Sequence, residues 1–392
     1  MPHLCLTLIP SVPVWADGDA VVLDRKFHDG LTQYVAAWPG RVRCLAWRGT
    51  TALSGFGAVR ARAADLPFDI ELLDDHEAIT SAHLEPATVV LAAADDHRQL
   101  HVAALCRQRG IRCVYVIEYI PETRHQINRL EAPNPFVRWR RDLFLLGRER
   151  ARRAAFEACD GLQANGIPAH DAYQTHGNCL LYFDTRMGRS SLVGDGALGA
   201  RLATLQQPRP LQLAFSGRLI AMKGVEHLVE VAARLHARGV ACEWTLYGAG
   251  ELDSQLRARV RRLGLAHIIQ LPGAVDFDTK LIPTIQSRCD LYVMLHRQSD
   301  PSCTYLETLS CGIPIVGYEN RALGGLLRLA RVGIGLPMDD IEAVVDALAR
   351  LHSDRDTIAR MSRAALAFAR GHAFEDTFQR RVDHLIELAA AQ

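Results

Sequence analysis

Short apolar runs alternate with stretches of helical periodicity along the whole chain. The predicted strands are rich in Val, Leu and Ile without clean alternation, which is typical of strands buried on both faces. In the first half they are Leu4–Ile9, Val42–Trp47, Thr88–Ala93 and Cys113–Ile117. In the second half they are Gln212–Ser216, Glu243–Tyr247, Ile268–Leu271, Leu291–Leu295 and Ile315–Tyr318.

Helical patterns separate these strands, as in Val225–Ala237, Leu252–Leu263 and Ile341–Leu351. Strand–helix alternation predicts an α/β protein with doubly wound parallel sheets, and the series runs twice. Residues 187–210 are rich in Gly and Ser and end in a Pro-flanked segment, which indicates an interdomain linker. We therefore expect domains at 1–186 and 211–370. An amphipathic helix over 371–392 is expected to pack back on the first domain.

Composition narrows the class of protein. The chain has 392 residues, of which 49% are hydrophobic, and a formal net charge of +1, so its size allows two or three domains. Its ten cysteines are scattered without a CxxC pair, which favours a reducing compartment. The N-terminus lacks the pattern of a secretory signal, and no apolar run approaches the ~20 residues of a membrane span. We expect a cytoplasmic protein.

The segment from Phe215 to Gly224 predicts a phosphate site. It leaves a buried strand, forms a loop and enters a helix whose first N–H groups are unpaired. Gly217 allows close backbone approach, while Arg218 and Lys223 add two cations suited to a diphosphate. The alternative is an ordinary strand–turn–helix with solvated cations.

Two later segments extend this hypothesis. Gly248 and Gly250 directly follow another strand, where they form either a phosphate-binding loop or a tight structural turn. Glu307 lies in the predicted short helix of Ser299–Pro314, among Tyr305, Leu306 and Leu309. A buried carboxylate there needs a partner, and a vicinal ribose diol is a suitable one. The alternative is a glutamate that faces solvent.

Taken together, these three segments resemble the retaining glycosyltransferases of family 4, which have the two-domain GT-B fold. The resemblance covers 210–350 well and the first half loosely. In that family the G-R-x-x-x-x-K-G segment binds the diphosphate of the donor, which implies this role for Arg218 and Lys223. A glutamate on a later helix binds the nucleotide ribose and is matched here by Glu307.

One departure concerns the sugar contacts. The family pattern E-x7-E has its first glutamate near the transferred sugar, but this chain has Ser299 at that place, followed by Asp300. Two interpretations remain open. Either Asp300 takes over the carboxylate role, or the hydroxyls of Ser299, Ser302 and Thr304 hold the sugar.

The first half is expected to face the acceptor and, by the resemblance, to supply a histidine. His97 is the best match because it follows a strand at its carboxyl end, where ligands of doubly wound sheets bind. A structural or exposed histidine is the alternative. Glu118, Tyr119 and Arg124 follow the next strand and are acceptor-side candidates. Gly18 is a weaker match to the glycine loop that follows the family's first strand.

Residues 136–153 form the local basic feature of the sequence. Seven arginines are interleaved there with large apolar residues such as Phe136, Trp139 and Phe144. Such a helix could lie on an anionic bilayer, which would suit a lipid-linked acceptor. It could equally pack on the sheet with a solvated arginine face. Nucleic acid is not expected as a partner, because no recognition fold accompanies the arginines.

These features predict transfer of a glycosyl group from a UDP- or GDP-type sugar nucleotide to an acceptor hydroxyl, with retention. Arg218, Lys223 and the helix N-terminus would stabilise the leaving diphosphate, so we expect no metal and no further cofactor. The Asp-x-Asp pairs at Asp17, Asp276 and Asp354 are interpreted as turn or surface residues. A sugar-nucleotide epimerase and a non-catalytic nucleotide-sugar-binding subunit are the alternatives. The missing first glutamate motivates the latter.

Overall fold

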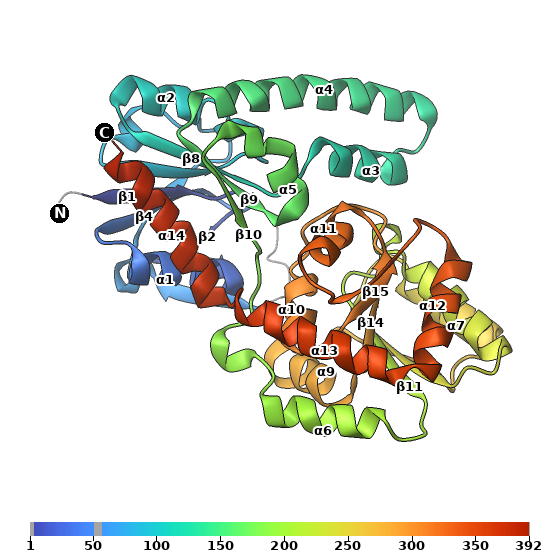
Figure 1. The fold of residues 1–392 in the computed structure, drawn as a ribbon. Helices are drawn as coiled ribbons and strands as arrows, with labels where there is room; N and C mark the ends of the chain where they lie inside the picture. Colours follow the sequence, from blue (N-terminus) through green and yellow to red (C-terminus); the bar gives the residue numbers. More distant parts are fainter. Residues whose placement is uncertain (1–3, 51–56, 392) are drawn as a thin grey trace. The chain divides into compact units, whose positions relative to one another are not determined.

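The computed structural model describes residues 4–50 and 57–391, which form two compact units. The first unit comprises residues up to Pro121, Pro135–Tyr182 and the C-terminal segment from Glu375. The second comprises Glu122–Asn134 and Phe183–Phe374. The red helix at the C-terminus consequently lies among the blue and green elements of the first unit (Figure 1).

A seven-stranded parallel sheet with the order β10-β9-β8-β7-β1-β4-β6 forms the centre of the first unit. Its strands are β1 (Cys5–Ile9), β4 (Arg41–Trp47), β6 (Asp69–Leu73), β7 (Val89–Ala93), β8 (Arg112–Ile117), β9 (Gly161–Asn165) and β10 (Cys179–Tyr182). A small antiparallel sheet accompanies it, made of β2 (Trp15–Asp17), β3 (Ala20–Asp24) and β5 (Ala58–Arg62). The helices of this unit are α1 (Arg25–Ala37), α2 (Val102–Arg109), α4 (Pro135–Ala158), α5 (Gly166–Tyr173) and α14 (Phe374–Ala390).

The second unit has a six-stranded parallel sheet with the order β13-β12-β11-β14-β15-β16. Its strands are β11 (Leu211–Ser216), β12 (Cys242–Tyr247), β13 (Ile269–Gly273), β14 (Leu291–Met294), β15 (Ile315–Tyr318) and β16 (Gly333–Leu336). Its helices are α3 (Pro121–Glu131), α6 (Asp195–Leu205), α7 (Val225–Ala237), α8 (Asp253–Arg262), α9 (Ile282–Arg288), α10 (Thr304–Ser310), α11 (Arg321–Leu329), α12 (Ile341–Ser353) and α13 (Arg355–Arg370).

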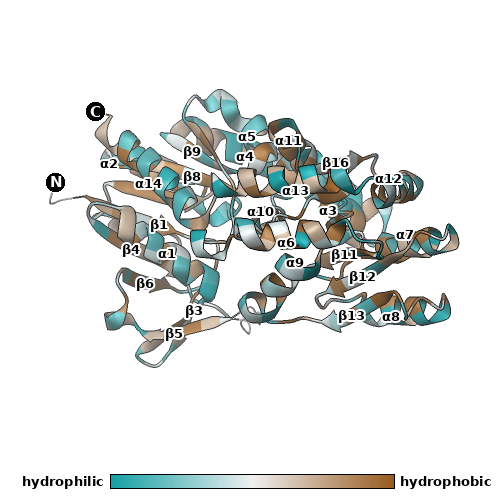
Figure 2. Ribbon diagram, turned by 60° about the horizontal axis from the view of Figure 1, so that its bottom comes forward, coloured by the Kyte–Doolittle hydropathy of each residue, from teal (hydrophilic) through white to brown (hydrophobic). Residues whose placement is uncertain are grey.

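The central strands of both sheets, such as β1, β7, β14 and β15, are buried on their two faces, which explains their apolar runs. Phe215, Leu291 and Val293 are completely buried in the core of the second unit, together with Val225 and Leu228 of α7. Figure 2 shows the strands largely in brown, while outer helices such as α8 and α14 carry teal segments. The predicted fold class, two parallel α/β sheets, is confirmed.

The segment expected as a linker, 187–210, contains a helix of the second unit. Leu198, Leu202 and Leu205 of α6 are buried in its core. Arg201 is also buried and donates to the carbonyl oxygens of Cys311 and Gly312, at 2.8 and 2.6 Å. The glycines of this segment therefore indicated a linker, although its leucines and Arg201 anchor it to the domain.

Two further segments belong to a different unit from the residues next to them in the sequence. Residues 122–134, expected in the first domain, belong to the second unit. There the Thr123 hydroxyl donates to the Ser299 carbonyl at 3.2 Å, and Arg321 pairs with Glu122 at 3.1 Å. In the opposite direction, α14 belongs to the first unit, where Phe378 packs edge-on against Tyr34 and Arg381 donates to Gln163.

Candidate functional site

The strand order of the second unit contains a topological switch point between β11 and β14. From β11 the chain proceeds to β12 and β13 on one side, and from β14 to β15 and β16 on the other. In sheets of this order, ligands bind outside the carboxyl ends of the strands at this point. The loops that leave β11 and β14 are 217–224 and 295–303, which contain most of the predicted donor-binding residues.

Lys223 and Asp300 join these two loops. Lys223 Nζ lies 3.1 Å from Asp300 Oδ2, and both side chains are almost fully buried. Burial by itself would raise the pKa of Asp300, but the Lys223 ammonium, with smaller contributions from His296 and Gln298, offsets it, so this pKa lies below its ordinary value. An ammonium has three N–H donors, so Lys223 keeps donors for a ligand while Asp300 holds it in place.

Gly224 allows the two loops to approach each other. Its φ is +63°, and a Cβ at this position would lie 2.1 Å from the carbonyl oxygen of Leu295. The obstacle is backbone, so no rotamer change can relieve it. The absence of a side chain at Gly224 therefore allows the loop that carries Lys223 to lie against the end of β14. Helix α7 begins at the next residue.

We expect Gly224→Ala to destabilise the protein by at least about 2 kcal/mol, because a left-handed alanine is strained and its Cβ meets a carbonyl. Gly110→Ala is the matched control. Gly110 has a φ of +67° and no atom within 4 Å of a Cβ, so only the conformational cost of about 1 kcal/mol applies. Urea unfolding monitored by circular dichroism measures both changes. Equal losses would contradict the role given to the Leu295 contact.

His296 is a site residue that the sequence analysis missed. It follows β14, is buried, and contacts the rings of Phe215 and Tyr305 edge-on. Burial, with the nearby Lys223 ammonium, lowers the pKa of His296 to about 3, so its ring is neutral at pH 7. Its Nδ1 has no hydrogen-bond partner among the described residues. A position directly after a strand beside the phosphate loop was the signal that could have found it.

The depressed pKa of His296 predicts a pH dependence of stability. The unfolded chain takes up a proton near pH 6.5, whereas the folded protein does so only near pH 3. The free energy of unfolding therefore falls as the pH drops from about 6.5 towards 3, by about 1.4 kcal/mol per pH unit from this group. Urea unfolding of wild type and His296→Gln at several pH values measures the difference. Parallel pH profiles would contradict the prediction.

Arg218 and the glycines differ in what they contact. Arg218 is exposed at the rim of the loop, and its guanidinium has no ion-pair partner within 4–50 and 57–391. The loops after β11 and β12 are joined by backbone hydrogen bonds, such as Leu219 N to Ala249 O at 2.9 Å. A Cβ at Gly248 would lie 1.8 Å from the Gly217 carbonyl oxygen, and one at Gly250 would lie 2.4 Å from that of Leu219. Gly248 and Gly250 are therefore required for the close packing of these two loops, whether or not a phosphate binds there.

Glu307 is buried, as expected for a carboxylate in an apolar helix, and it has a partner in the chain. Arg186 Nε lies 3.1 Å from Glu307 Oε1, and the same guanidinium stacks 3.6 Å above the centre of the Phe277 ring. Phe277 begins a π-helical turn that leads into α9. Arg186 lies 121 residues from Glu307 in the sequence, so no local signal could have linked them.

The hydroxyls of the β14–α10 loop differ in their surroundings. Ser299 is buried, its Oγ accepts from the backbone N–H of Arg321 at 3.2 Å, and its own N–H donates to Gln126 of α3 at 2.9 Å. Ser302 and Thr304 are half-buried and hydrogen-bond each other at 3.2 Å. Ser299 therefore connects this loop to α3 and α11 by hydrogen bonds. Asp300 is the residue of the loop that pairs with Lys223.

The candidates in the first unit lie around its own switch point, between β1 and β7. His97 starts a 3₁₀ turn just after β7 and its side chain is 58% exposed. Partial desolvation and Arg148 lower its pKa, which keeps the imidazole neutral at pH 7. The backbone N–H groups of Glu118 and Tyr119 donate to the carboxylate of Asp95.

Other predicted positions have simpler surroundings. Gly18, with a φ of +64°, turns the β2–β3 hairpin. Arg124 lies on α3 and thus in the second unit, not in the first as expected. Asp17 pairs with Arg60, whereas Asp276 and Asp354 accept from the N–H groups of Thr279 and Thr357 at the starts of helical turns.

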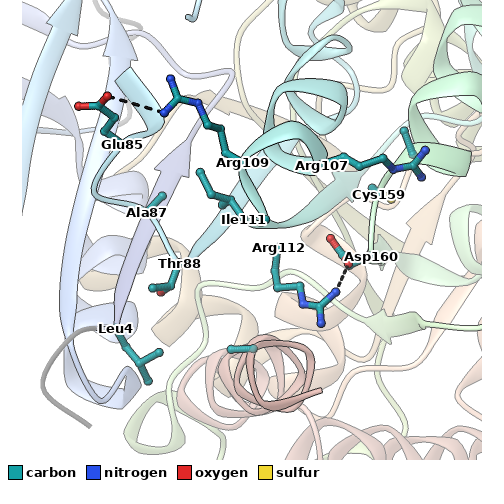
Figure 3. A pocket seen from close by; sticks show the side chains of 13 residues that line it. Leu4, Glu85, Ala87, Thr88, Arg107, Arg109, Ile111, Arg112, Cys159 and Asp160 are labelled. Carbon is teal, nitrogen blue, oxygen red and sulfur yellow. Dashed lines mark hydrogen bonds and ion pairs between the residues drawn. The ribbon is translucent and has the colours of Figure 1, made fainter. Parts of the chain in front are cut away.

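A separate hollow of about 700 Å³ lies in the first unit (Figure 3). Thr88 and Arg112 precede or begin strands there, so the hollow lies at the amino ends of the sheet, away from the switch point. Two of its three arginines are paired, Arg112 with Asp160 at 2.8 Å and Arg109 with Glu85 at 3.8 Å. It contains none of the predicted site residues.

Residues 203–368 match the family model of glycosyl transferases group 1. Among solved structures, the chain is similar over 98% of its length to all of HepE from Anabaena in complex with UDP-glucose (TM-score 0.62, 15% identity). It is also similar over 97% of its length to 99% of WaaG, a glycosyltransferase involved in lipopolysaccharide biosynthesis (TM-score 0.60, 12% identity). The fold is GT-B.

Curated relatives are similar to part of the chain. The chain is 28% identical over 176 residues to alpha-D-kanosaminyltransferase of Streptomyces kanamyceticus, and this alignment covers 44% of the chain and 45% of that enzyme. It is 25% identical over 178 residues to 2-deoxystreptamine N-acetyl-D-glucosaminyltransferase of Streptomyces fradiae, covering 45% and 42%. The matched segments thus span less than half the length of these relatives. None of the described helices is long and apolar enough to cross a membrane.

Proposed function

We propose that this GT-B protein transfers a glycosyl group from a nucleoside-diphosphate sugar to an acceptor hydroxyl, with retention at the anomeric carbon, as its resemblance to family 4 implies. The observation that carries the proposal is Lys223, a buried cation at the switch point, in the same loop as the exposed Arg218. The group 1 match over 203–368 and the UDP-glucose complex of HepE support this donor class. The acceptor we propose is a lipid-linked, polysaccharide or glycolipid intermediate.

In this proposal the chain's cations stabilise the leaving group. Negative charge develops on the diphosphate as the glycosidic bond breaks, and cations fixed before the reaction lower the barrier most. Lys223 is held by Asp300, whereas Arg218 is free to move onto the diphosphate. No step in this account requires a divalent metal. The neutral His296 beside Lys223 adds no competing charge.

Glu307 is the proposed ribose ligand, with a UDP or GDP donor. Arg186 already contacts one oxygen of this carboxylate, at 3.1 Å. We expect Glu307→Gln to weaken nucleotide binding by about tenfold or more, because a hydrogen bond to a charged group is replaced by a neutral one. Isothermal titration with UDP and GDP measures this. Unchanged affinity for both nucleotides would contradict the ribose assignment.

The test of the proposed function starts with a thermal-shift screen against UDP, GDP, ADP and their sugars, because a ligand raises stability by mass action. Donor consumption is then assayed for Arg218→Ala, with Arg261→Ala as the matched control. Arg261 is an exposed arginine of α8 in the same unit. Loss of turnover in Arg218→Ala alone supports the diphosphate role, and equal turnover in both variants refutes it. The anomeric configuration of the product, determined by NMR, tests retention.

A non-catalytic, nucleotide-sugar-binding subunit is the second candidate. It is favoured by Ser299, whose hydroxyl and backbone are engaged with Arg321 and α3 at the place of the family's first glutamate. Nucleotide binding without donor turnover, across the donor panel and with membrane extract supplied as acceptor, would support this candidate over the transferase.

A further inference from the structure

Helix α4 is packed at one end and exposed at the other. Its carboxyl-terminal part runs beside α2, whereas its amino-terminal part extends beyond α2 (Figure 1). Arg152, Ala155 and Phe156 near the end of the helix are buried. The interpretation that its apolar residues pack on the sheet therefore holds for this end only.

The amino-terminal part of α4 presents large apolar side chains to solvent. Phe136, Trp139, Leu143, Phe144 and Leu146 are 50–69% exposed. Four of them, spaced at 136, 139, 143 and 146, fall on one face of a helix with 3.6 residues per turn. We call these four residues the α4 stripe. Isolated exposed leucines are ordinary, but an aromatic and aliphatic stripe of this length marks an interaction surface.

Cations border the stripe. Arg140 and Arg150 are exposed, and their positions on the helix place them beside the stripe or in line with it. Among the other charged groups of this helix, Arg153 pairs with Glu149 and Arg138 with Asp142. The exposed half of α4 thus contains both apolar side chains that can enter a bilayer interface and an excess of positive charge. This is the composition of an interfacial helix.

We propose that the α4 stripe docks this protein on the surface of an anionic lipid bilayer, with the helix lying in the interface plane. Charge complementarity points to this occupant, because anionic headgroups attract each arginine while the apolar side chains of the stripe enter the interface. Trp139 has the side chain that favours the boundary between headgroups and acyl chains. The inference does not rest on the proposed transferase activity.

The test is sedimentation of the full chain with phosphatidylcholine vesicles that contain about 30% phosphatidylglycerol, or none. We expect binding to the anionic vesicles, weakened by salt because the arginine attraction is screened. The Trp139→Ser/Leu143→Ser variant is expected to lose about tenfold or more of this binding. A matched control is Leu329→Ser, an equally exposed leucine on α11 of the second unit.

The charge contribution is tested with Arg140→Glu/Arg150→Glu, again with an expected loss of about tenfold or more. Its control is Arg261→Glu/Arg262→Glu on α8 of the second unit, which changes the net charge by the same amount without altering α4. Thermal unfolding verifies that all variants are folded. The proposal is overturned if wild type does not bind anionic vesicles, or if the stripe variants bind as wild type does. It is also overturned if sedimentation equilibrium shows that the stripe mediates self-association while the protein does not bind vesicles.

Discussion

Replacing Lys223 by methionine is expected to lower kcat/KM for the sugar nucleotide by about 10²–10³-fold, because a fixed cation at a developing negative charge contributes that much to a reaction. Most of the loss should fall on kcat, since the charge on the diphosphate grows as the bond breaks. Steady-state kinetics with the donor identified by thermal shift measure both parameters. A variant that turns over as wild type does would remove Lys223 from the mechanism.

A structural effect must be separated from this catalytic one. Lys223→Met leaves the Asp300 carboxylate buried without its partner, so part of any lost activity could come from a perturbed loop. The variant Lys223→Met/Asp300→Leu removes both charges. We expect it to be folded and as inactive as Lys223→Met, because the missing cation and not the unpaired carboxylate limits turnover.

The second large effect is on stability. Asp300→Leu leaves the Lys223 ammonium buried and unpaired, which is expected to cost about 3 kcal/mol of the free energy of unfolding. The second substitution, Lys223→Met, should recover most of that loss, because an apolar pair of similar size is no worse than a buried ion pair. Urea unfolding of the two single variants and the double variant measures the coupling. Additive losses would contradict a direct Lys223–Asp300 interaction.

The sheets could be predicted from the sequence because their cause is local. Ile315–Tyr318 and Val225–Ala237 agree residue for residue, and the other predicted strands agree within two residues at their ends, as do the helices Leu252–Leu263 and Ile341–Leu351. The C-terminal helix starts at Phe374, three residues later than expected, and α4 ends five residues beyond the basic segment 136–153. Both faces of central strands such as β1, β7, β14 and β15 are buried, so these strands are largely apolar runs between polar loops.

Four strands of the parallel sheets were missed: β6, β10 and β16 are only partly buried, and β9 contains Gln163 and Asn165. The small sheet of β2, β3 and β5 was also missed, because its strands are short and, in β5, contain arginines at alternate positions.

The candidate site was predictable only in part. The loop after β11 carries its own signal, because two glycines and two cations lie within a strand–loop–helix segment. The pairing of Lys223 with Asp300 and of Glu307 with Arg186 spans 77 and 121 residues, and a single sequence contains no trace of such contacts. His296 lies three positions before Ser299, where the residues that match the family pattern begin, so the resemblance does not indicate it.

The exchange of segments between the two units has a consequence for synthesis on the ribosome. The first unit takes in α14, which places Phe378 on Tyr34 and Arg381 on Gln163, so it cannot complete its core until the last residues have emerged. The second unit likewise depends on 122–134, translated long before its sheet. Neither half of the chain is an autonomous folding module. Dissecting the protein at residue 186, the apparent boundary in the sequence, would produce two incomplete fragments.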